Sequence, residues 1–276
     1  MFRLHLLYTL LAAGVLAACS APETRPTAAL PARTPVVAPA LATAPVAAPA
    51  DAEAALTARL HALAPRADIG VLALAVEARA CALRSGAVSE DARLAVIDYS
   101  QPSTEKRMWV FDVAADRLMY EELVAHGQGT GDNLARRFSN RDGSHQTSLG
   151  LYRTAETYVG GNGYSLRMDG LDPGFNDNAR ARAIVMHGAW YVDPALAARN
   201  GRIGRSHGCP ALREGVARAV IDDLKGEQLV FAYADDVAWL QGARSFACDG
   251  RSARQILASA RGDLPAGGAP VAVAAP

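Results

Sequence analysis

Apolar residues recur at helical spacing in the first regularly patterned part of the chain. Residues 52–63 and 69–84 carry Ala, Leu and Arg with this spacing, and Pro65 separates the two segments. Val71 and Leu74 lie on one face of the second segment. The pattern predicts two helices, the second of which buries one face.

From residue 94 onward the pattern changes to short apolar runs rich in β-branched residues, which are typical of strands. Turn-forming sequences lie at Ala115-Asp116 and at 160–163. We expect strands at 94–99, 107–113, 117–124, 148–154, 164–171, 183–187 and 229–233, and helices at 212–224 and 237–246. Many short strands with few helices predict a mainly β domain, either a β-sandwich or a barrel with flanking helices.

The N-terminal apolar run reads as a targeting segment. It covers residues 6–18, which is too short for a bilayer span of about 20 residues. It ends in Leu16-Ala17-Ala18-Cys19, which resembles a bacterial lipobox and implies cleavage before Cys19 and lipid on that residue. Ser20 favours the outer membrane by analogy with enteric sorting. The alternative is an ordinary signal peptide.

Composition divides the remaining chain. Residues after Cys19 are dominated by Ala, Pro and Thr, which favours an extended tether, and the last residues are Ala/Gly/Pro-rich. We therefore expect a signal peptide at 1–18, a tether at 19–50, a helical segment at 51–90, a β-rich catalytic domain at 91–262 and a disordered tail at 263–276.

Charge and residue spacing exclude several classes of partner. The chain has 28 basic and 28 acidic residues and no basic stripe, so nothing indicates nucleic acid. The six histidines show no metal-ligand spacing. We expect no metal and no cofactor, and the sequence does not indicate the oligomeric state.

The four cysteines divide by role. Cys19 is the lipidation site, and Cys209 is a candidate nucleophile. An export signal places Cys81 and Cys248 in an oxidising compartment, where we expect them to form a disulfide that joins an N-terminal helix to the C-terminal segment. The alternative is two buried free thiols.

The strongest chemical signal is the sequence Gly204-Arg-Ser-His-Gly-Cys-Pro210. Thiol catalysis requires a thiolate, a base that forms it and backbone amides that bind the oxyanion. Gly208 permits close approach of the chain to a substrate because it has no Cβ. His187 lies at the end of an upstream apolar run, so we expect Cys209 to be the nucleophile and His187 its base.

These motifs resemble those of the YkuD-type L,D-transpeptidase catalytic domain, in its second, murein L,D-transpeptidase branch. The resemblance covers about residues 90–235 and includes His187-Gly188 and Ser206-His207-Gly208-Cys209. It also includes the segments 138–140, 148–152, 165–167, 176–179 and 182–185. The fold implied is an L,D-transpeptidase-like β-sandwich or barrel.

The resemblance implies a reaction on the peptidoglycan stem peptide. Cys209 would attack the carbonyl of the third stem residue, release the terminal D-alanine and form a thioester, which an amine from a neighbouring stem would resolve as a 3–3 cross-link. The carbonyl of Gly188 would orient His187. The amides of Gly208 and Cys209 would form the oxyanion hole, and Ser206 would order the loop.

The substrate-binding residues are less defined. The main branch of the family carries Arg or Asn two positions after the cysteine, where this chain has Ala211. The candidates for contacts with substrate are His207, Arg205, Asn176 and Tyr191, with packing or loop capping as the alternative for His207, Asn176 and Tyr191.

Three other functions stay open. With water as the acceptor, the same residues would make an L,D-carboxypeptidase. A wall-binding lipoprotein that lost catalysis would not need both His187 and Cys209. Papain-like and NlpC-type thiol hydrolases place the Cys before the His in the chain, which is the reverse of the order here.

Overall fold

The computed structural model describes residues 49–263. The predicted signal peptide, Cys19, nearly all of the tether and the tail from residue 264 lie outside these residues. The described residues all belong to one compact unit. Within residues 49–263, no helix combines the length and the apolar character that crossing a bilayer requires.

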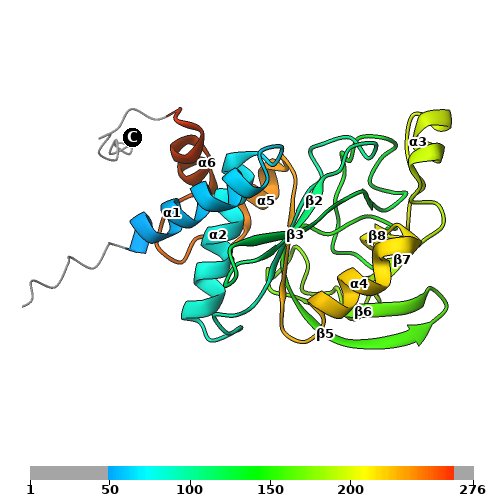
Figure 1. Ribbon diagram of the computed structural model, residues 1–276, viewed down its shortest axis with the longest axis horizontal. Coiled ribbons are helices and arrows are strands. Elements are labelled where there is room, and N and C mark those ends of the chain that lie inside the picture. Colours follow the sequence, from blue (N-terminus) through cyan, green and yellow to red (C-terminus); the bar gives the residue numbers. More distant parts are fainter. Residues whose placement is uncertain (1–48, 264–276) are drawn as a thin grey trace, which may run out of the picture. The chain divides into compact units, whose positions relative to one another are not determined.

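The unit combines one sheet with flanking helices (Figure 1). The helices are α1 (Pro49–Leu63), α2 (Ile69–Arg84), α3 (Pro194–Asn200), α4 (Glu214–Leu224), α5 (Val237–Gly242) and α6 (Ala253–Arg261). The strands are β1 (Leu94–Asp98), β2 (Met108–Asp112), β3 (Arg117–Glu122), β4 (Val124–Ala125), β5 (Gly150–Gly160), β6 (Gly163–Gly170), β7 (Val185–Gly188), β8 (Ala211–Leu212) and β9 (Leu229–Tyr233). The predicted fold class, mainly β with a barrel-like sheet and flanking helices, is confirmed.

The strand order is β3-β2-β1-β9-β5-β6-β7-β8-β4, in a sheet that curls into a nearly closed barrel. The late strand β9 inserts between β1, to which it is parallel, and β5, to which it is antiparallel. Strands β7 and β8 are also parallel neighbours. This topology brings the predicted base on β7 and the residues just before β8 to the same part of the sheet.

The central hairpin is longer than the apolar pattern indicates. β5 continues to Gly160, and Gly163 opens β6 opposite it, so the predicted glycine turn closes the hairpin. The pairing register shifts between Thr154 and Thr157. An irregularity of this kind breaks the alternation of side chains, which explains why the sequence pattern predicts a strand that ends at 154.

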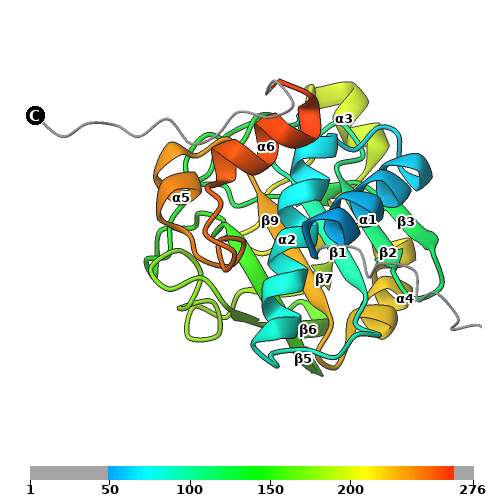
Figure 2. The ribbon, with the colours of Figure 1, turned by 90° about the vertical axis from the view of Figure 1, so that its left-hand side faces the viewer.

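Helix α2 is the helix most deeply embedded in the core. It packs between α1 and α6 and against β1 and β9 (Figure 2). Leu72 and Leu74 are fully buried, and they belong to the same apolar cluster as the strand residues Val96 and Phe231. The predicted helical segment 51–90 and the β-rich domain therefore share one hydrophobic core, because α2 has apolar residues on nearly all sides.

Some elements were not expected from the sequence. Strands β4 and β8 have only two residues each, which is too short to show alternation. Leu212 ends β8, so α4 begins at Glu214 and not at 212. Helix α6 does carry a start signal, the capping box of Ser252 and Gln255.

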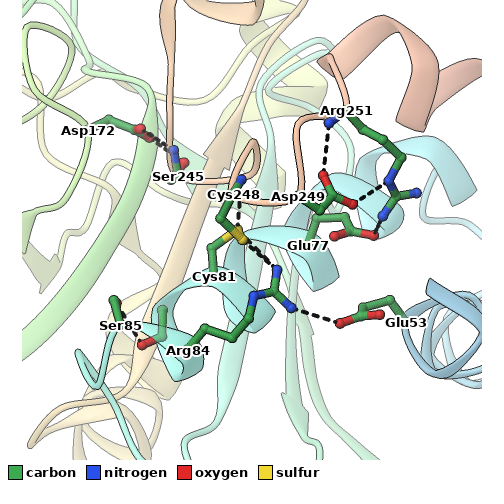
Figure 3. The surroundings of a disulfide bond; sticks show 11 residues. Glu53, Glu77, Cys81, Arg84, Ser85, Asp172, Ser245, Cys248, Asp249 and Arg251 are labelled. Atoms are coloured by element: carbon green, nitrogen blue, oxygen red, sulfur yellow. Dashed lines mark hydrogen bonds and ion pairs between the residues drawn. A yellow bond between two sulfur atoms is a disulfide. The ribbon is translucent and has the colours of Figure 1, made fainter. Parts of the chain in front are cut away.

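Cys81 and Cys248 form a disulfide, the pairing expected from the sequence (Figure 3). Their Cα atoms are 5.7 Å apart, and the bond joins the end of α2 to the segment before α6. Ser245 on that segment also donates a 2.7 Å hydrogen bond to the buried carboxylate of Asp172. The disulfide and this hydrogen bond both attach the C-terminal segment to the body of the domain.

We expect replacement of Cys248 by Ser to lower the free energy of unfolding by about 2–5 kcal/mol, because the bond closes a long loop in the unfolded chain. Denaturant unfolding measures this change. The matched Cys81→Ser variant and the double variant should lose the same amount. Two additional titratable thiols in the folded, unreduced wild type would contradict the bond.

Candidate active site

The pairing of β7 with β8 positions the thiol. His187 lies opposite Ala211, so Cys209 runs alongside Val185. The Val185 N–H donates to Cys209 Sγ at 3.5 Å, and the thiol lies 3.7 Å from the carbonyl oxygen of Ala183. Cys209 and His187 are both buried, at 7% and 4% exposure. The nucleophile candidate therefore lies beside the strand that carries its candidate base.

A single hydrogen bond fixes the tautomer of His187. Its Nδ1 lies 2.9 Å from the carbonyl oxygen of Gly188, the next residue. Because a carbonyl only accepts hydrogen bonds, Nδ1 must carry the hydrogen, and Nε2 is left with a free lone pair. Burial lowers the pKa of His187, so the imidazole is neutral at neutral pH and Nε2 is ready to accept a proton.

The environment of Cys209 disfavours a permanent thiolate. Burial raises the pKa of the Cys209 thiol, and the Val185 N–H and the charge of Arg182 oppose this effect. The resting pair is therefore a neutral thiol and a neutral imidazole. Such a site forms the thiolate when a proton moves to the base during the reaction.

Ser206 holds the turn that presents the thiol. Its Oγ accepts a 3.1 Å hydrogen bond from the Gly208 N–H and donates at 2.7 Å to the carbonyl of Cys209. Gly208 has φ of +121°, which strongly favours glycine. The Gly208 amide is thus occupied by Ser206 and does not support its expected part in an oxyanion hole. Within residues 49–263 the Cys209 amide bonds no other residue and interacts only with its own sulfur, so it stays available for that role.

A second loop closes over this turn. The Gln128 N–H donates to the Ser206 carbonyl at 2.8 Å, and the Ser206 N–H donates to the His126 carbonyl at 3.0 Å. Thr147 Oγ1 accepts from the Gly127 N–H at 2.9 Å and donates to the Gly208 carbonyl at 3.3 Å. The glycine-containing segment from His126 is therefore an ordered clamp on the turn that carries Cys209.

Arg107 and His126 support the clamp from inside the barrel. Both side chains are fully buried, and Arg107 Nη2 lies 2.8 Å from His126 Nδ1. Arg107 also donates to the carbonyls of Val124 and Gln101. Burial and the neighbouring guanidinium lower the pKa of His126 to about 4, so this histidine stays neutral. Sequence reasoning missed Arg107, since a lone arginine beside a strand carries no signal of its partners.

Residues 63–233 match the L,D-transpeptidase catalytic domain family, a stretch that includes every residue of this site. The chain belongs to this family.

Solved structures of the family show a distant likeness. An L,D-transpeptidase from Mycobacterium smegmatis is 13% identical with a TM-score of 0.32, and the match covers 52% of this chain and 59% of that one. One from Mycobacterium tuberculosis is 17% identical with a TM-score of 0.31, covering 52% and 58%. One from Stackebrandtia nassauensis is 12% identical with a TM-score of 0.32, covering 66% and 90%. This chain thus spans about three fifths of the length of the mycobacterial chains. No curated protein matches the chain in sequence.

Two predicted substrate contacts of this L,D-transpeptidase domain serve the fold. Asn176 is fully buried, and its side chain bonds the Asp172 N–H and the Leu151 carbonyl. It has no surface left for a substrate, which corrects the expectation. Arg205 donates at 2.9 Å to the Asp132 carboxylate and to the Gly131 carbonyl. Its Nη1 is already paired with Asp132, so Arg205 is not an unpartnered carboxylate-binding group.

The other two candidates lie near the turn. His207 is exposed and stacks on His145, with ring centroids 4.3 Å apart. Tyr191 is half-buried and packs edge-on against Trp190, which is 71% exposed. Both stay candidates for contacts with substrate. Arg213, another cation near the cysteine, makes a bidentate ion pair with Glu122.

We expect Gly127→Ala to slow acylation of Cys209 by about a hundredfold, because a small displacement of a reacting group has an effect of this order. A Cβ at Gly127 would lie 2.3 Å from the His145 carbonyl oxygen and 2.9 Å from the Gly208 backbone, and would displace the turn. Intact mass after exposure to a carbapenem measures the rate.

Gly161→Ala is the matched control, since a Cβ at Gly161 meets no atom within 4 Å. It should acylate at the native rate. A native rate for Gly127→Ala would show that the clamp does not set the position of Cys209.

Proposed function

We propose that the protein is a cysteine-dependent L,D-transpeptidase that acts on peptidoglycan stem peptides. The observation that carries the proposal is the arrangement of Cys209, His187 and the Gly188 carbonyl. Family membership supports it, since the matched family is a transpeptidase catalytic domain. A buried thiol beside a strand whose histidine presents a free Nε2 has the parts that acyl transfer requires.

In the first half-reaction, the Cys209 thiol gives its proton to His187 Nε2, and Sγ forms a bond to the carbonyl carbon of the third stem residue. The bond from that carbon to the nitrogen of the terminal D-alanine then breaks. The leaving nitrogen takes the proton from His187, which acts now as an acid. The product is a thioester on Cys209 and free D-alanine.

In the second half-reaction, an amine of a neighbouring stem attacks the thioester carbonyl and gives its proton to His187. The carbon–sulfur bond breaks, and the departing Cys209 thiolate takes the proton from His187. The two stems are then joined by a 3–3 link. With water in place of the amine, the same steps release a shortened stem, which is the carboxypeptidase alternative. A binding protein without catalysis would need neither the tautomer of His187 nor the ordered turn at Cys209.

In this scheme the Cys209 amide N–H stabilises the oxyanion. Among residues 49–263 that N–H bonds no residue other than Cys209 itself, while Ser206 occupies the neighbouring amide of Gly208. An oxyanion donor lowers a barrier by about 3 kcal/mol. Ser206 would contribute by keeping the Cys209 carbonyl turned away from the substrate, because its hydroxyl binds that oxygen.

We also propose that the protein is anchored by lipid on Cys19, faces the periplasm and resides in the outer membrane. The support is the sequence alone: Leu16-Ala17-Ala18 before the cysteine and the Ala/Pro-rich stretch after it. An anchor with several acyl chains holds a protein firmly at a membrane. A tethered catalytic domain would then face its polymeric substrate.

The test of the activity is incubation of protein from residue 46 onward with purified tetrapeptide-stem muropeptides, followed by mass spectrometry. We expect 3–3 dimers and free D-alanine, and the absence of both with Cys209→Ala. Gly161→Ala serves as the matched active variant. Tripeptide stems without dimers would establish the carboxypeptidase, and unchanged muropeptides would overturn the proposed activity.

The test of the anchor is the mass of the mature N-terminal peptide from membranes of a bacterial host. We expect it to begin at Cys19 and to carry acyl chains, and Cys19→Ala to move the protein to the soluble periplasmic fraction. An unmodified N-terminus at another position would contradict the lipoprotein assignment.

A further inference from the structure

Arg182 is a charged residue with an unusual set of partners. Its Nη1 donates to the Ser139 carbonyl at 2.8 Å and to Ser148 Oγ at 2.5 Å. Its Nη2 donates to Ser144 Oγ at 3.1 Å and to the Gln146 carbonyl at 2.8 Å. All four acceptors are uncharged oxygens. They belong to one loop, so the guanidinium holds that loop together.

The charge of Arg182 is not neutralised by an ion pair. Within the described chain no carboxylate lies within ion-pair distance of it, and its Nε is buried without a partner. The charged and titratable groups that act on it are Tyr152, the exposed Asp142 and Cys209. Arg180, only two residues earlier, differs sharply: it is exposed and pairs with Asp169 and Glu156.

The position of Arg182 relates this free charge to the nucleophile. Gln146, whose carbonyl accepts from Nη2, touches the catalytic turn: a Cβ at Gly208 would lie 2.8 Å from that oxygen. Ala183, the residue that follows Arg182, has φ of +51° and turns its carbonyl toward Cys209 Sγ. The Gln146 carbonyl therefore links the Arg182 guanidinium to Gly208, the residue that precedes Cys209.

We propose that Arg182 is a positioning residue that supplies the positive charge stabilising the Cys209 thiolate, and that its loop contacts hold this charge in place. The inference deepens the proposed function and rests on Cys209 being its nucleophile. When the thiol proton moves to His187 Nε2, the sulfur keeps the bonding electron pair and gains a full negative charge. A fixed cation without an ion-pair partner, next to a thiol that is largely shielded from water, stabilises the negative charge on the sulfur.

The groups around Cys209 respond to this charge unequally. Burial raises the pKa of the Cys209 thiol and the charge of Arg182 opposes that rise, whereas burial lowers the pKa of His187 and only the Gly188 carbonyl opposes that fall. Tyr99 and Tyr191 also face the sulfur, and burial raises the pKa of both, so they are neutral at neutral pH. Arg182 is therefore the cation that acts on the sulfur in preference to the imidazole.

The test is the pH dependence of Cys209 alkylation by iodoacetamide in the full chain, followed on the Cys209 peptide by mass spectrometry. Alkylation reports the thiolate and needs no stem peptide, so it is independent of the transpeptidase assay. In Arg182→Met we expect the apparent pKa of Cys209 to rise by about one unit, which is about a tenfold lower rate at neutral pH.

Three further variants separate charge from structure. Arg182→Lys keeps the charge without the forked contacts, and its thiolate pKa should stay close to the native value even if thermal stability falls. Arg180→Met, the matched control two residues away, should alkylate as the wild type does. Arg182→Gln replaces the Met variant if that protein does not fold, since an amide still donates to the loop carbonyls.

A native thiolate pKa in a folded Arg182→Met or Arg182→Gln protein would overturn the proposal. An equal rise in the Lys and Met variants would also overturn it, because it would show that loop geometry and not charge sets the thiolate. If the pKa of Cys209 rises in Arg182→Met as expected, but the wild type leaves the muropeptides unchanged, Arg182 keeps this role and only the transpeptidase assignment is overturned.

Discussion

The parallel pairing of β7 with β8 is the constraint on which the site depends. It sets His187 opposite Ala211 and so brings Cys209 alongside Val185. A strand of two residues contributes few hydrogen bonds of its own, so this register needs other contacts. They come from the clamp, where Thr147 bonds both Gly127 and Gly208. The backbone of Gly127 lies too close to that of Gly208 for a side chain to fit.

The electrostatics of the site follow from its burial. Removal from water opposes charge on both the thiol and the imidazole, and the resting site carries no charge on either. Two arginines that make no ion pair among the described residues, Arg107 and Arg182, lie in the surrounding shell. They are held mainly by carbonyl and hydroxyl oxygens, which accept hydrogen bonds from both guanidinium groups without adding a full negative charge.

The sequence predicts the parts of this structure that depend on local pattern. The strands with alternating or continuous apolar runs, the hairpin turns and the motif residues Cys209 and His187 are of this kind. The strand order is not, because β9 inserts beside β1 through long-range pairing. Asn176 is a second example of what local pattern cannot show. A polar residue in a motif is interpreted as a ligand contact, and only its burial in the fold reveals a structural role. Arg182 begins the matched segment 182–185, but its role gave no signal, since its acceptors are backbone and serine oxygens whose positions depend on the fold.

The insertion of β9 between β1 and β5 also governs how the chain folds. Just before β1, the Arg93 N–H donates to the side chain of Gln228, which lies just before β9, a separation of 135 residues. Until the chain beyond residue 229 is present, β1 has an unpaired edge and the core around α2 is incomplete. Domains with contacts this distant in sequence fold slowly and tend to expose sheet edges on the way. The turn that carries Cys209 precedes β9 in the chain, so it is synthesised while the sheet that supports it still lacks this central strand.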